Sequence, residues 1–266
     1  MQATDLELLI DAANEAGRIA VRFAGGVAKS WDKPGDEGPV TEADLAVNSM
    51  LETRLQSARP EYGWLSEETE DGSDRLNRDT LFIIDPIDGT RSFADGSRTW
   101  AHSLAIAHQG RVTASVIFLP QRDQLFSAAE QGGAWLNGAR IEPSQTQIMT
   151  EAEVLAARPN MDARHWKEGR VPEFNRAYRP SLAYRLATVA QGRFDGMLTL
   201  RPSWEWDIAA GDLILREAGA ICSDRAGKPL RFNNSHPKVD GVIAANTAIH
   251  AQILDALAHS STGEPA

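Results

Sequence analysis

The 266-residue sequence predicts an α/β fold, because segments with helical periodicity alternate with segments typical of strands. A helical spacing of apolar residues opens the chain, and a short apolar run at residues 81–84 followed by clustered apolar residues at 101–128 indicates a sheet. From about residue 141 shorter strands mix with helices. We therefore expect an N-terminal α+β domain over residues 1–140 and a C-terminal α/β domain over residues 141–266.

Two helices are expected in the first 60 residues. Apolar residues recur at spacings of three and four from Asp5 to Phe23, and a pair of glycines at residues 25–26 ends this segment. Residues 29–40 are rich in charge, Gly and Pro and predict a surface loop. Thr41 is a suitable N-cap for the second helix, which Pro60 closes.

The middle of the chain predicts strands, and the second half adds helices. The run 81–84 is wholly apolar and is followed at once by Asp85 and Pro86, as expected of a buried strand with acids at its end. Antiparallel strands joined by hairpins are expected at 101–107, 111–119 and 124–128. Helices are expected at 181–191, 208–218 and 248–258, and the last six residues are expected to fray.

The composition argues against several classes of function. Lys and Arg total 27 against 37 for Asp and Glu, and the resulting net charge of −10 disfavours a nucleic-acid duplex as partner. Cys222 is the single cysteine, and no basic leader or apolar run of membrane length is present, which predicts a soluble cytoplasmic protein. An acidic protein can still bind anions where bound cations reverse the local field.

The segment Asp85 to Thr90, with sequence DPIDGT, is the most informative short motif. Pro86 fixes one φ angle and Gly89 permits a tight turn, so that Asp85 and Asp88 can project toward one point. Oxygen ligands on a rigid turn suit Mg²⁺, and a helix beginning near Thr90 would aim free N–H groups at the same place. The alternative is an ordinary turn, since Asp, Pro and Gly favour turns in any case.

Three further acidic segments allow both a structural and a functional interpretation. Glu67 and Glu68 follow an apolar pair, and they are either a solvated charge pair or the source of one inward carboxylate. Asp207 precedes an apolar helical segment, where it would serve as an N-cap or as a metal ligand. Asp44 stands three residues after Thr41, as in a capping box, and it is also a candidate for a polar site.

Taken together in chain order, these segments resemble a known family. GPVTEADL, WLSEET, DPIDGTRSF and WEWDIAAGD are similar to the four signature segments of the inositol monophosphatase superfamily, and the likeness extends to LNGARI and GVIAAN. The resemblance implies a layered α-β-α-β-α sandwich of the inositol monophosphatase and sugar phosphatase type. It also implies hydrolysis of a small phosphate monoester with two or three Mg²⁺ ions, a homodimer, and sensitivity to Li⁺.

The resemblance assigns roles to individual residues. Thr90 matches the hydroxyl that positions the attacking water, Asp44 matches the acid bonded to that threonine, and Glu67 helps to orient the water. Bound divalent cations supply the positive charge that such hydrolysis requires, so no covalent protein nucleophile is needed. The implied metal ligands are Glu67, Asp85, the carbonyl of Ile87, Asp88 and Asp207.

The substrate is less closely defined by the sequence. The implied substrate contacts are the amides of Gly89 and Thr90, together with Ser181, Arg185 and Arg201. Inositol-specific members carry a Glu seven residues before the metal-binding aspartate, whereas this chain has Leu200 there, followed by Arg201. An Arg suits a second phosphate, which favours a substrate like 3′-phosphoadenosine 5′-phosphate. Surface salt bridges are the structural alternative for Arg185 and Arg201.

Other functions remain open at this stage. Inositol 1-phosphate, histidinol phosphate and fructose 1,6-bisphosphate are the alternative substrates that the resemblance allows. A protein of another class, which binds a phosphate ligand on the same fold without catalysis, is the remaining alternative. His102 lies close to the metal loop in sequence and is a further candidate for substrate contact.

Overall fold

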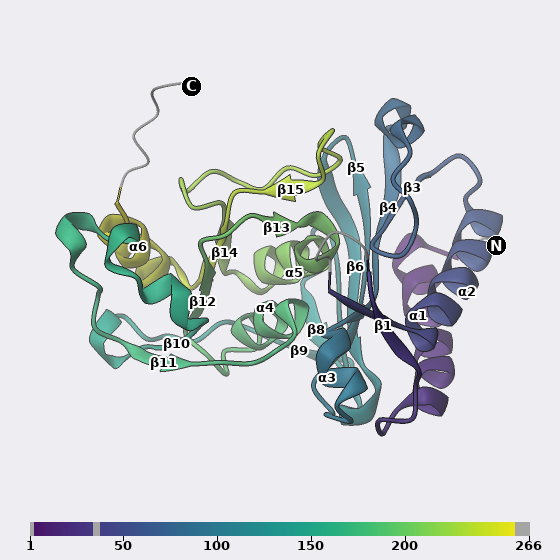
Figure 1. Ribbon diagram of the computed structural model, residues 1–266. Coiled ribbons are helices and arrows are strands. Elements are labelled where there is room, and N and C mark those ends of the chain that lie inside the picture. The colour runs from purple at the N-terminus through teal and green to yellow at the C-terminus, as the bar shows by residue number, and fades with distance from the viewer. Residues whose placement is uncertain (1–2, 34–37, 259–266) are drawn as a thin grey trace, which may run out of the picture.

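Five layers of helices and sheets make up the computed structural model, which describes residues 3–33 and 38–258 (Figure 1). Helices α1 and α2 form one outer layer, a large sheet follows, α4 and α5 lie in the middle, and a smaller sheet separates them from α6. The predicted α-β-α-β-α sandwich is therefore confirmed. The helices are α1 (Asp5–Ala20), α2 (Glu42–Ala58), α3 (Thr90–Ala94), α4 (Leu182–Ala190), α5 (Glu205–Ala218) and α6 (Thr247–Ala256).

The large sheet has seven strands that follow one another in chain order. Its first pair is parallel and every later pair is antiparallel, as hairpin connections require. The strands are β3 (Gly63–Ser66), β4 (Thr80–Asp88), β5 (Ala101–His108), β6 (Arg111–Leu119), β7 (Gln124–Ala129), β8 (Ala134–Leu136) and β9 (Ala139–Arg140).

The smaller sheet has the order β11-β10-β12-β16-β14 and mixes parallel and antiparallel pairs. Its strands are β10 (Glu153–Ala156), β11 (Asn175–Ala177), β12 (Gly196–Thr199), β14 (Ile221–Ser223) and β16 (Val242–Ala245). Two short ribbons complete the strands of the described residues: β1 (Ser30–Asp32) with β2 (Pro39–Thr41), and β13 (Ser203–Trp204) with β15 (Lys238–Val239).

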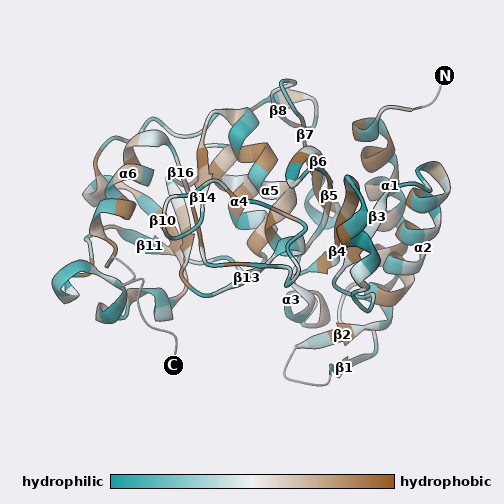
Figure 2. Cartoon of the chain, turned by 90° about the horizontal axis from the view of Figure 1, so that it is seen from above, coloured by the Kyte–Doolittle hydropathy of each residue, from teal (hydrophilic) through white to brown (hydrophobic). Residues whose placement is uncertain are grey.

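The alternation of side chains along β4 explains how one strand packs against two layers of helices. Phe82 and Ile84 pack in the cluster formed with α1 and α2, whereas Leu81 and Ile83 pack in the cluster formed with α4 and α5. Because successive side chains point to opposite faces, both faces of the strand are buried and its sequence is continuously apolar. Hydrophobic segments of α4 and α5 fill the space between the two sheets (Figure 2).

The packing of α4 on α5 depends on one glycine. A Cβ atom added at Gly211 would lie 2.4 Å from Cδ1 of Leu186 and 2.6 Å from its Cβ. Any larger residue would therefore push the two helices apart. Since α5 also carries Asp207, this close packing helps to position the helix that presents that carboxylate.

Strand β4 continues through the DPID segment, which the sequence places in a turn beyond residue 84. The register of β4 against β5 shifts between Asp85, which faces Ser103, and Asp88, which faces Ala101. On the other side, β3 pairs only as far as Ile84, so Pro86 costs no ladder hydrogen bond there. An irregular stretch of this kind re-aims side chains, and it brings the two aspartates to one end of the sheet.

Several predicted boundaries are corrected by the structure. The first helix ends at Ala20, and a short 3₁₀ turn covers residues 21–23. Residues 29–40 are not only a loop, because β1 and β2 pair with one another there; residues 34–37 lie outside the described part. The frayed tail expected for the last six residues also lies outside the described residues. The remaining predicted helices and strands are present within a few residues of their expected bounds.

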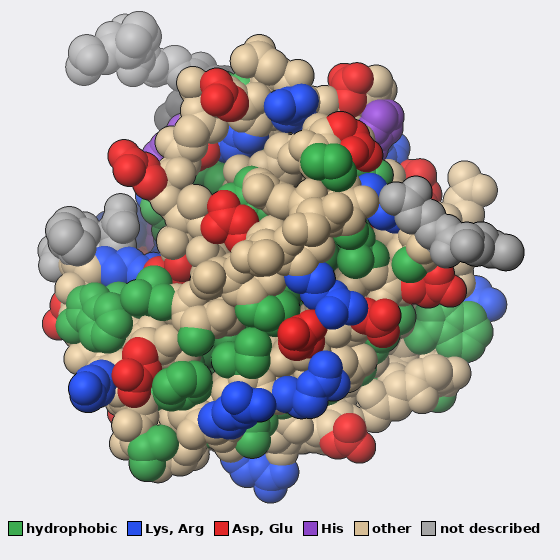
Figure 3. Space-filling model, turned by 90° about the vertical axis from the view of Figure 1, so that its right-hand side faces the viewer, with side chains coloured by type: hydrophobic (Ala, Val, Ile, Leu, Met, Phe, Trp, Pro, Cys, Tyr) green, Lys and Arg blue, Asp and Glu red, His purple; other side chains and the backbone are tan. Residues whose placement is uncertain are grey.

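The surface over α1 and α2 carries acidic and basic side chains interspersed with single hydrophobic ones (Figure 3). Within residues 3–33 and 38–258, no helix has the length and the apolar character that crossing a bilayer demands.

Candidate metal centre and adjoining cavities

Three carboxylates from three separate elements meet at one end of the large sheet. Glu67 follows β3 directly, Asp85 lies within β4, and Asp207 is the third residue of α5. Each offers one oxygen, and these oxygens all lie within 4.8 Å of one another. The sequence segments that carry the three acids therefore converge as predicted, although 140 residues separate the first from the last.

The charges of this cluster are only partly compensated by the protein, because Lys33 pairs with Glu67 whereas Asp85 has no partner among the described residues. Asp85 is buried, and neither of its carboxylate oxygens has a hydrogen-bond partner among the described residues. Burial raises the pKa of Asp85 well above its ordinary value, and the negative charges of Glu67 and Asp88 raise it further. The pKa of Asp207 is also raised, by burial first and then by Asp88 and Glu67. Buried carboxylates that repel one another in this way are suited to bind divalent cations. Carboxylate oxygens are the ligands that Mg²⁺ prefers.

Asp88 is held by the start of α4. Its Oδ2 accepts hydrogen bonds from the hydroxyl of Ser181 and from the amide of Ala183, both at 2.6 Å. Ser181 in turn caps α4 by accepting a hydrogen bond from the amide of Tyr184 at 3.0 Å. Burial nevertheless raises the pKa of Asp88 above its usual value. Ser181 is predicted from the sequence to contact the substrate, whereas in the structure its hydroxyl donates to Asp88.

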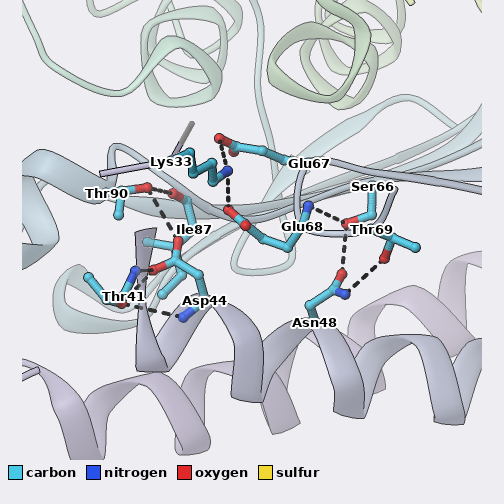
Figure 4. Close-up of polar contacts among 10 residues, drawn as sticks. All are labelled: Lys33, Thr41, Asp44, Asn48, Ser66, Glu67, Glu68, Thr69, Ile87 and Thr90. Atoms are coloured by element: carbon cyan, nitrogen blue, oxygen red, sulfur yellow. Dashed lines mark hydrogen bonds and ion pairs between the residues drawn. The ribbon is translucent and has the colours of Figure 1, made fainter. Parts of the chain in front are cut away.

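Asp44 and Thr90 form a buried polar group beside the carboxylates (Figure 4). The hydroxyl of Thr90 lies 3.3 Å from Oδ1 of Asp44 and 3.1 Å from the carbonyl oxygen of Ile87. Asp44 also accepts hydrogen bonds from the amide and the hydroxyl of Thr41, which confirms the predicted capping box at the start of α2. Burial raises the pKa of Asp44 to about 6. One carboxylate thus caps a helix and contacts the site.

Lys33 is a part of the centre that the sequence motifs do not predict. Its Nζ lies 3.0 Å from Glu67 and 2.7 Å from Glu68 (Figure 4). Burial and the charge of Glu67 raise the pKa of Glu68 to about 7, against the opposing effect of Lys33. No motif spacing signals this lysine, because the contact arises only when the β1–β2 ribbon folds toward the end of β3.

Two cavities reach Asp207, and a third reaches Glu67 and Glu68 beside Lys33. The first, which we call the main cavity, has a volume of about 710 Å³, and Glu67, Gly89, Thr90 and Asp207 lie in its wall. Gly89 adopts a positive φ of 94°, which glycine tolerates and which brings the chain to the start of α3. The main cavity wall also contains residues that are not predicted from the sequence motifs, among them Arg91, Tyr178, His236 and Lys238.

The second, which we call the arginine cavity, has a volume of about 610 Å³ and reaches Asp88 and Asp207 from the side of the smaller sheet. It contains the predicted Arg185 and Arg201, and neither side chain forms an ion pair within the described residues, so the salt bridges expected as the structural alternative are not seen there. Leu200 also lies in its wall. Four arginines contribute to this wall: Arg91, Arg164, Arg185 and Arg201.

Two expectations for individual residues are corrected here. Asp207 is not the N-cap of its helix, because α5 begins at Glu205 and Trp204 takes the cap position. His102 is fully buried and contacts the carbonyl of Pro86, so it supports the DPID segment from behind instead of meeting a substrate. Burial lowers the pKa of His102 to about 4, which keeps it neutral.

Known proteins share both this fold and this length of chain. An inositol-1-monophosphatase of Mesorhizobium japonicum is 34% identical over 269 residues, with 95% of each chain covered. The Nus factor SuhB of Escherichia coli is 30% identical, with 94% of each chain covered. The structure of the Thermotoga maritima inositol monophosphatase has a TM-score of 0.79 at 30% identity, covering 94% of this chain and 95% of that one.

The layered fold and the acidic centre, taken with these likenesses, define a phosphoric monoester hydrolase. Within that class the chain belongs to the inositol monophosphatase family, whose model matches residues 1–262. The family resemblance given by the four sequence segments is thereby confirmed.

Proposed function

We propose that this protein hydrolyses a small phosphorylated metabolite with the help of two or three Mg²⁺ ions. The convergence of Glu67, Asp85 and Asp207 carries the proposal, because three carboxylates within 4.8 Å of one another are unfavourable without cations. Asp88 and the carbonyl of Ile87 complete the proposed ligand set. Asp85 would be one of the residues that hold the ions, because both of its oxygens lack a hydrogen-bond partner within the described residues.

The protein's own residues hold the reacting groups in place. Bound Mg²⁺ supplies positive charge that neutralises the phosphate oxygens and activates a water for attack. Thr90 donates its proton toward Asp44, which leaves an oxygen lone pair to accept a hydrogen bond from that water. Glu67 lies on the main cavity wall and is the proposed second partner of the water. The amides of Gly89 and Thr90 are proposed to hold the phosphate.

Inositol 1-phosphate is the substrate that the comparisons favour. The curated relative at 34% identity is an inositol-1-monophosphatase, and no comparison specifically favours a 3′-phosphoadenosine 5′-phosphate nucleotidase. The observation that still supports a bisphosphate is the group of arginines beside Asp88 and Asp207. Histidinol phosphate is supported by a histidinol-phosphatase of Chlorobaculum parvum that is 28% identical over 263 residues, a lower identity than that of the inositol-1-monophosphatase. Fructose 1,6-bisphosphate has no specific observation in its favour.

Release of inorganic phosphate from inositol 1-phosphate, measured with Mg²⁺ and with EDTA, tests this function. We expect turnover in Mg²⁺ and none in EDTA. A noncatalytic ligand-binding protein would instead bind the ester in Mg²⁺, detected by calorimetry, without releasing phosphate. That outcome, repeated over the other esters named above, would refute the proposed hydrolysis.

A further inference from the structure

Strand β5 contacts both parts of the chain that carry most of the proposed metal ligands (Figure 1). It pairs with β4, which contains the DPID segment, and α5, which presents Asp207, packs against it. Two adjacent residues of β5, His102 and Ser103, are polar and buried. Successive residues of a strand point to opposite faces of the sheet, so these two side chains leave β5 in opposite directions. Buried polar groups need hydrogen-bond partners, and each of the two finds one near a proposed ligand.

His102 holds the backbone at the irregular part of β4. Between Asp85 and Asp88 the register shifts, so that two residues of β4 lie opposite the single His102. Nδ1 of His102 contacts the carbonyl oxygen of Pro86, and since a carbonyl only accepts, Nδ1 carries the proton and donates the hydrogen bond. The other ring nitrogen has no partner in the described part of the chain. The bond therefore fixes the backbone directly after Asp85, whose own carboxylate is held by no hydrogen bond there.

Ser103 holds the start of α5 from the other face of the sheet. Its hydroxyl donates to the carbonyl oxygen of Trp206 at 2.9 Å. Trp206 directly precedes Asp207 in the first turn of α5. The bond joins residues that are 103 positions apart in the chain, and it ties the helix that presents Asp207 to the strand that pairs with the DPID segment.

The two bonds act on the backbone next to the carboxylates, and not on a substrate. Neither His102 nor Ser103 is among the residues that line the main cavity or the arginine cavity. Mg²⁺ demands a nearly ideal octahedral arrangement of its oxygen ligands, so a small displacement of one carboxylate weakens binding. Groups that orient metal ligands without touching the metal commonly change its affinity by about tenfold to a hundredfold. The spacing of Asp85 from Asp207 depends on both bonds.

We propose that His102 and Ser103 are positioning residues of the metal centre, which fix the DPID segment and the start of α5 to one strand and so raise the affinity for divalent cations. This inference rests on the proposed function and adds two residues that touch neither metal nor substrate. A role in packing alone would lower the stability of the protein and leave the metal affinity of the folded molecule unchanged.

Two substitutions of His102 separate its hydrogen bond from its volume. Asn offers an amide N–H near the position of Nδ1 but leaves a space where the ring lay, whereas Leu fills a similar volume and donates nothing. His102→Leu should weaken Mn²⁺ binding by about tenfold, and His102→Asn should bind Mn²⁺ with nearly wild-type affinity. The electron paramagnetic resonance signal of free Mn²⁺ measures binding without any substrate. Weaker binding by the Asn variant than by the Leu variant would contradict the role of the hydrogen bond.

Ser103→Ala removes the hydroxyl that holds Trp206, and it should also weaken Mn²⁺ binding by about tenfold. Ser115→Ala is the matched control. Ser115 is a buried serine on the neighbouring strand β6, and its hydroxyl has no hydrogen-bond partner within residues 3–33 and 38–258. This control should keep the wild-type affinity. Circular dichroism confirms that each variant is folded before its affinity is compared.

Phosphate release gives a second measurement. In His102→Leu and Ser103→Ala the Mg²⁺ concentration for half-maximal release should rise, while saturating Mg²⁺ should restore most of the wild-type kcat, because added metal fills a weakened centre. A lower kcat at saturating Mg²⁺ with an unchanged Mg²⁺ requirement would contradict a role in positioning the metal ligands.

The outcomes distinguish this inference from the proposed function. If the wild type binds Mn²⁺ and hydrolyses inositol 1-phosphate, but His102→Leu and Ser103→Ala bind Mn²⁺ as tightly as the wild type, the positioning role is refuted and the function stands. If both variants weaken Mn²⁺ binding but the wild type hydrolyses no ester, the function fails and the positioning role stands. A wild type that binds no Mn²⁺ would refute both.

Discussion

At the scale of single residues, the centre depends on carboxylates whose negative charges the protein compensates only in part. Asp85 has no hydrogen bond to either oxygen among the described residues, whereas Asp88 is supported by α4 and Asp44 by the start of α2. These environments suit different roles: a ligand shared between ions, a ligand oriented by a helix, and an acceptor for Thr90. The three carboxylates carry the same charge, and their different neighbours give them different roles.

Asp88→Asn and Asp207→Asn should each lower phosphate release by at least about a hundredfold, because each removes an anionic ligand from a proposed shared ion. Both variants should remain folded, since Asn keeps the size of the side chain. Asp74→Asn, at an exposed aspartate outside the centre, is the control and should retain full activity. Near wild-type turnover by both buried-site variants would contradict the proposed ligand set.

At the scale of elements, helix starts position the polar side chains of the site. The first turn of α4 binds Asp88, the capping box of α2 orients Asp44, and the first turn of α5 carries Asp207. A helix N-terminus has free amides and a partial positive charge, which stabilise nearby carboxylates. The three helices come from distant parts of the chain, and packing against the two sheets brings their starts together.

Ser181→Ala should lower the free energy of unfolding by about 1 kcal/mol, because α4 loses its cap. It should also raise the Mg²⁺ concentration needed for half-maximal activity, since Asp88 loses the hydroxyl at 2.6 Å. Thr4→Ala removes the cap of α1, far from the centre, and serves as the control. If the two variants show the same Mg²⁺ requirement in activity titrations, the hydroxyl of Ser181 has no positioning role.

Gly211→Ala should destabilise the protein by about 1–3 kcal/mol, because the new methyl group overlaps Leu186 where α4 crosses α5. Urea unfolding followed by circular dichroism measures the change. Gly72→Ala is the matched control, as nothing lies within 4 Å of the added Cβ and the φ angle is not positive. Equal stability of the Gly211 and Gly72 variants would show that the two helices can separate without cost.

At the scale of the whole molecule, folding concentrates negative charge that cations must compensate. Burial raises the pKa values of Asp85 and Asp207, and raises that of Asp44 to about 6. A raised pKa means that the folded protein holds these protons more tightly than the unfolded chain. Stability without metal should therefore fall as the pH rises from about 4, the ordinary value for aspartate, through about 6.

Because of these carboxylates, thermal unfolding in EDTA should give a lower Tm at pH 8 than at pH 5. Addition of Mg²⁺ should raise the Tm more at pH 8 than at pH 5. Asp85→Asn should reduce both effects, because it removes one buried negative charge. The Tm shift between Mg²⁺ and EDTA at each pH is the quantity to compare. A shift that is the same at both pH values in the wild type would mean that the carboxylates are compensated without metal.

Much of this architecture is predictable from local sequence. The apolar run 81–84, the alternating strands to residue 128 and the Thr41 cap each match the structure, because burial and capping act over a few residues. The role of Lys33 and the composition of the arginine cavity are harder to predict from sequence, because their contacts join segments that are far apart in the chain. Helix α5 begins before its predicted start, because an aspartate is favourable at the N-cap and also within the first turn of a helix.

Other expectations drawn from the sequence stay predictions. They are the division into domains at residue 140, the homodimer, the cytoplasmic location and the sensitivity to Li⁺. The central cluster of α4, α5 and the facing strands contains residues from both halves of the chain. The proposed centre likewise takes Glu67 and Asp85 from the first half and Asp207 from the second. The first half alone therefore lacks one carboxylate of the centre.

The central claim is that distant carboxylates gather around shared divalent cations. Anomalous diffraction from crystals grown with Mn²⁺ in place of Mg²⁺ tests this claim most directly. We predict at least one strong anomalous peak within about 2.5 Å of carboxylate oxygens of Glu67, Asp85 or Asp207. The absence of any peak at these side chains, in a protein whose phosphate release requires Mn²⁺, would contradict the proposed centre.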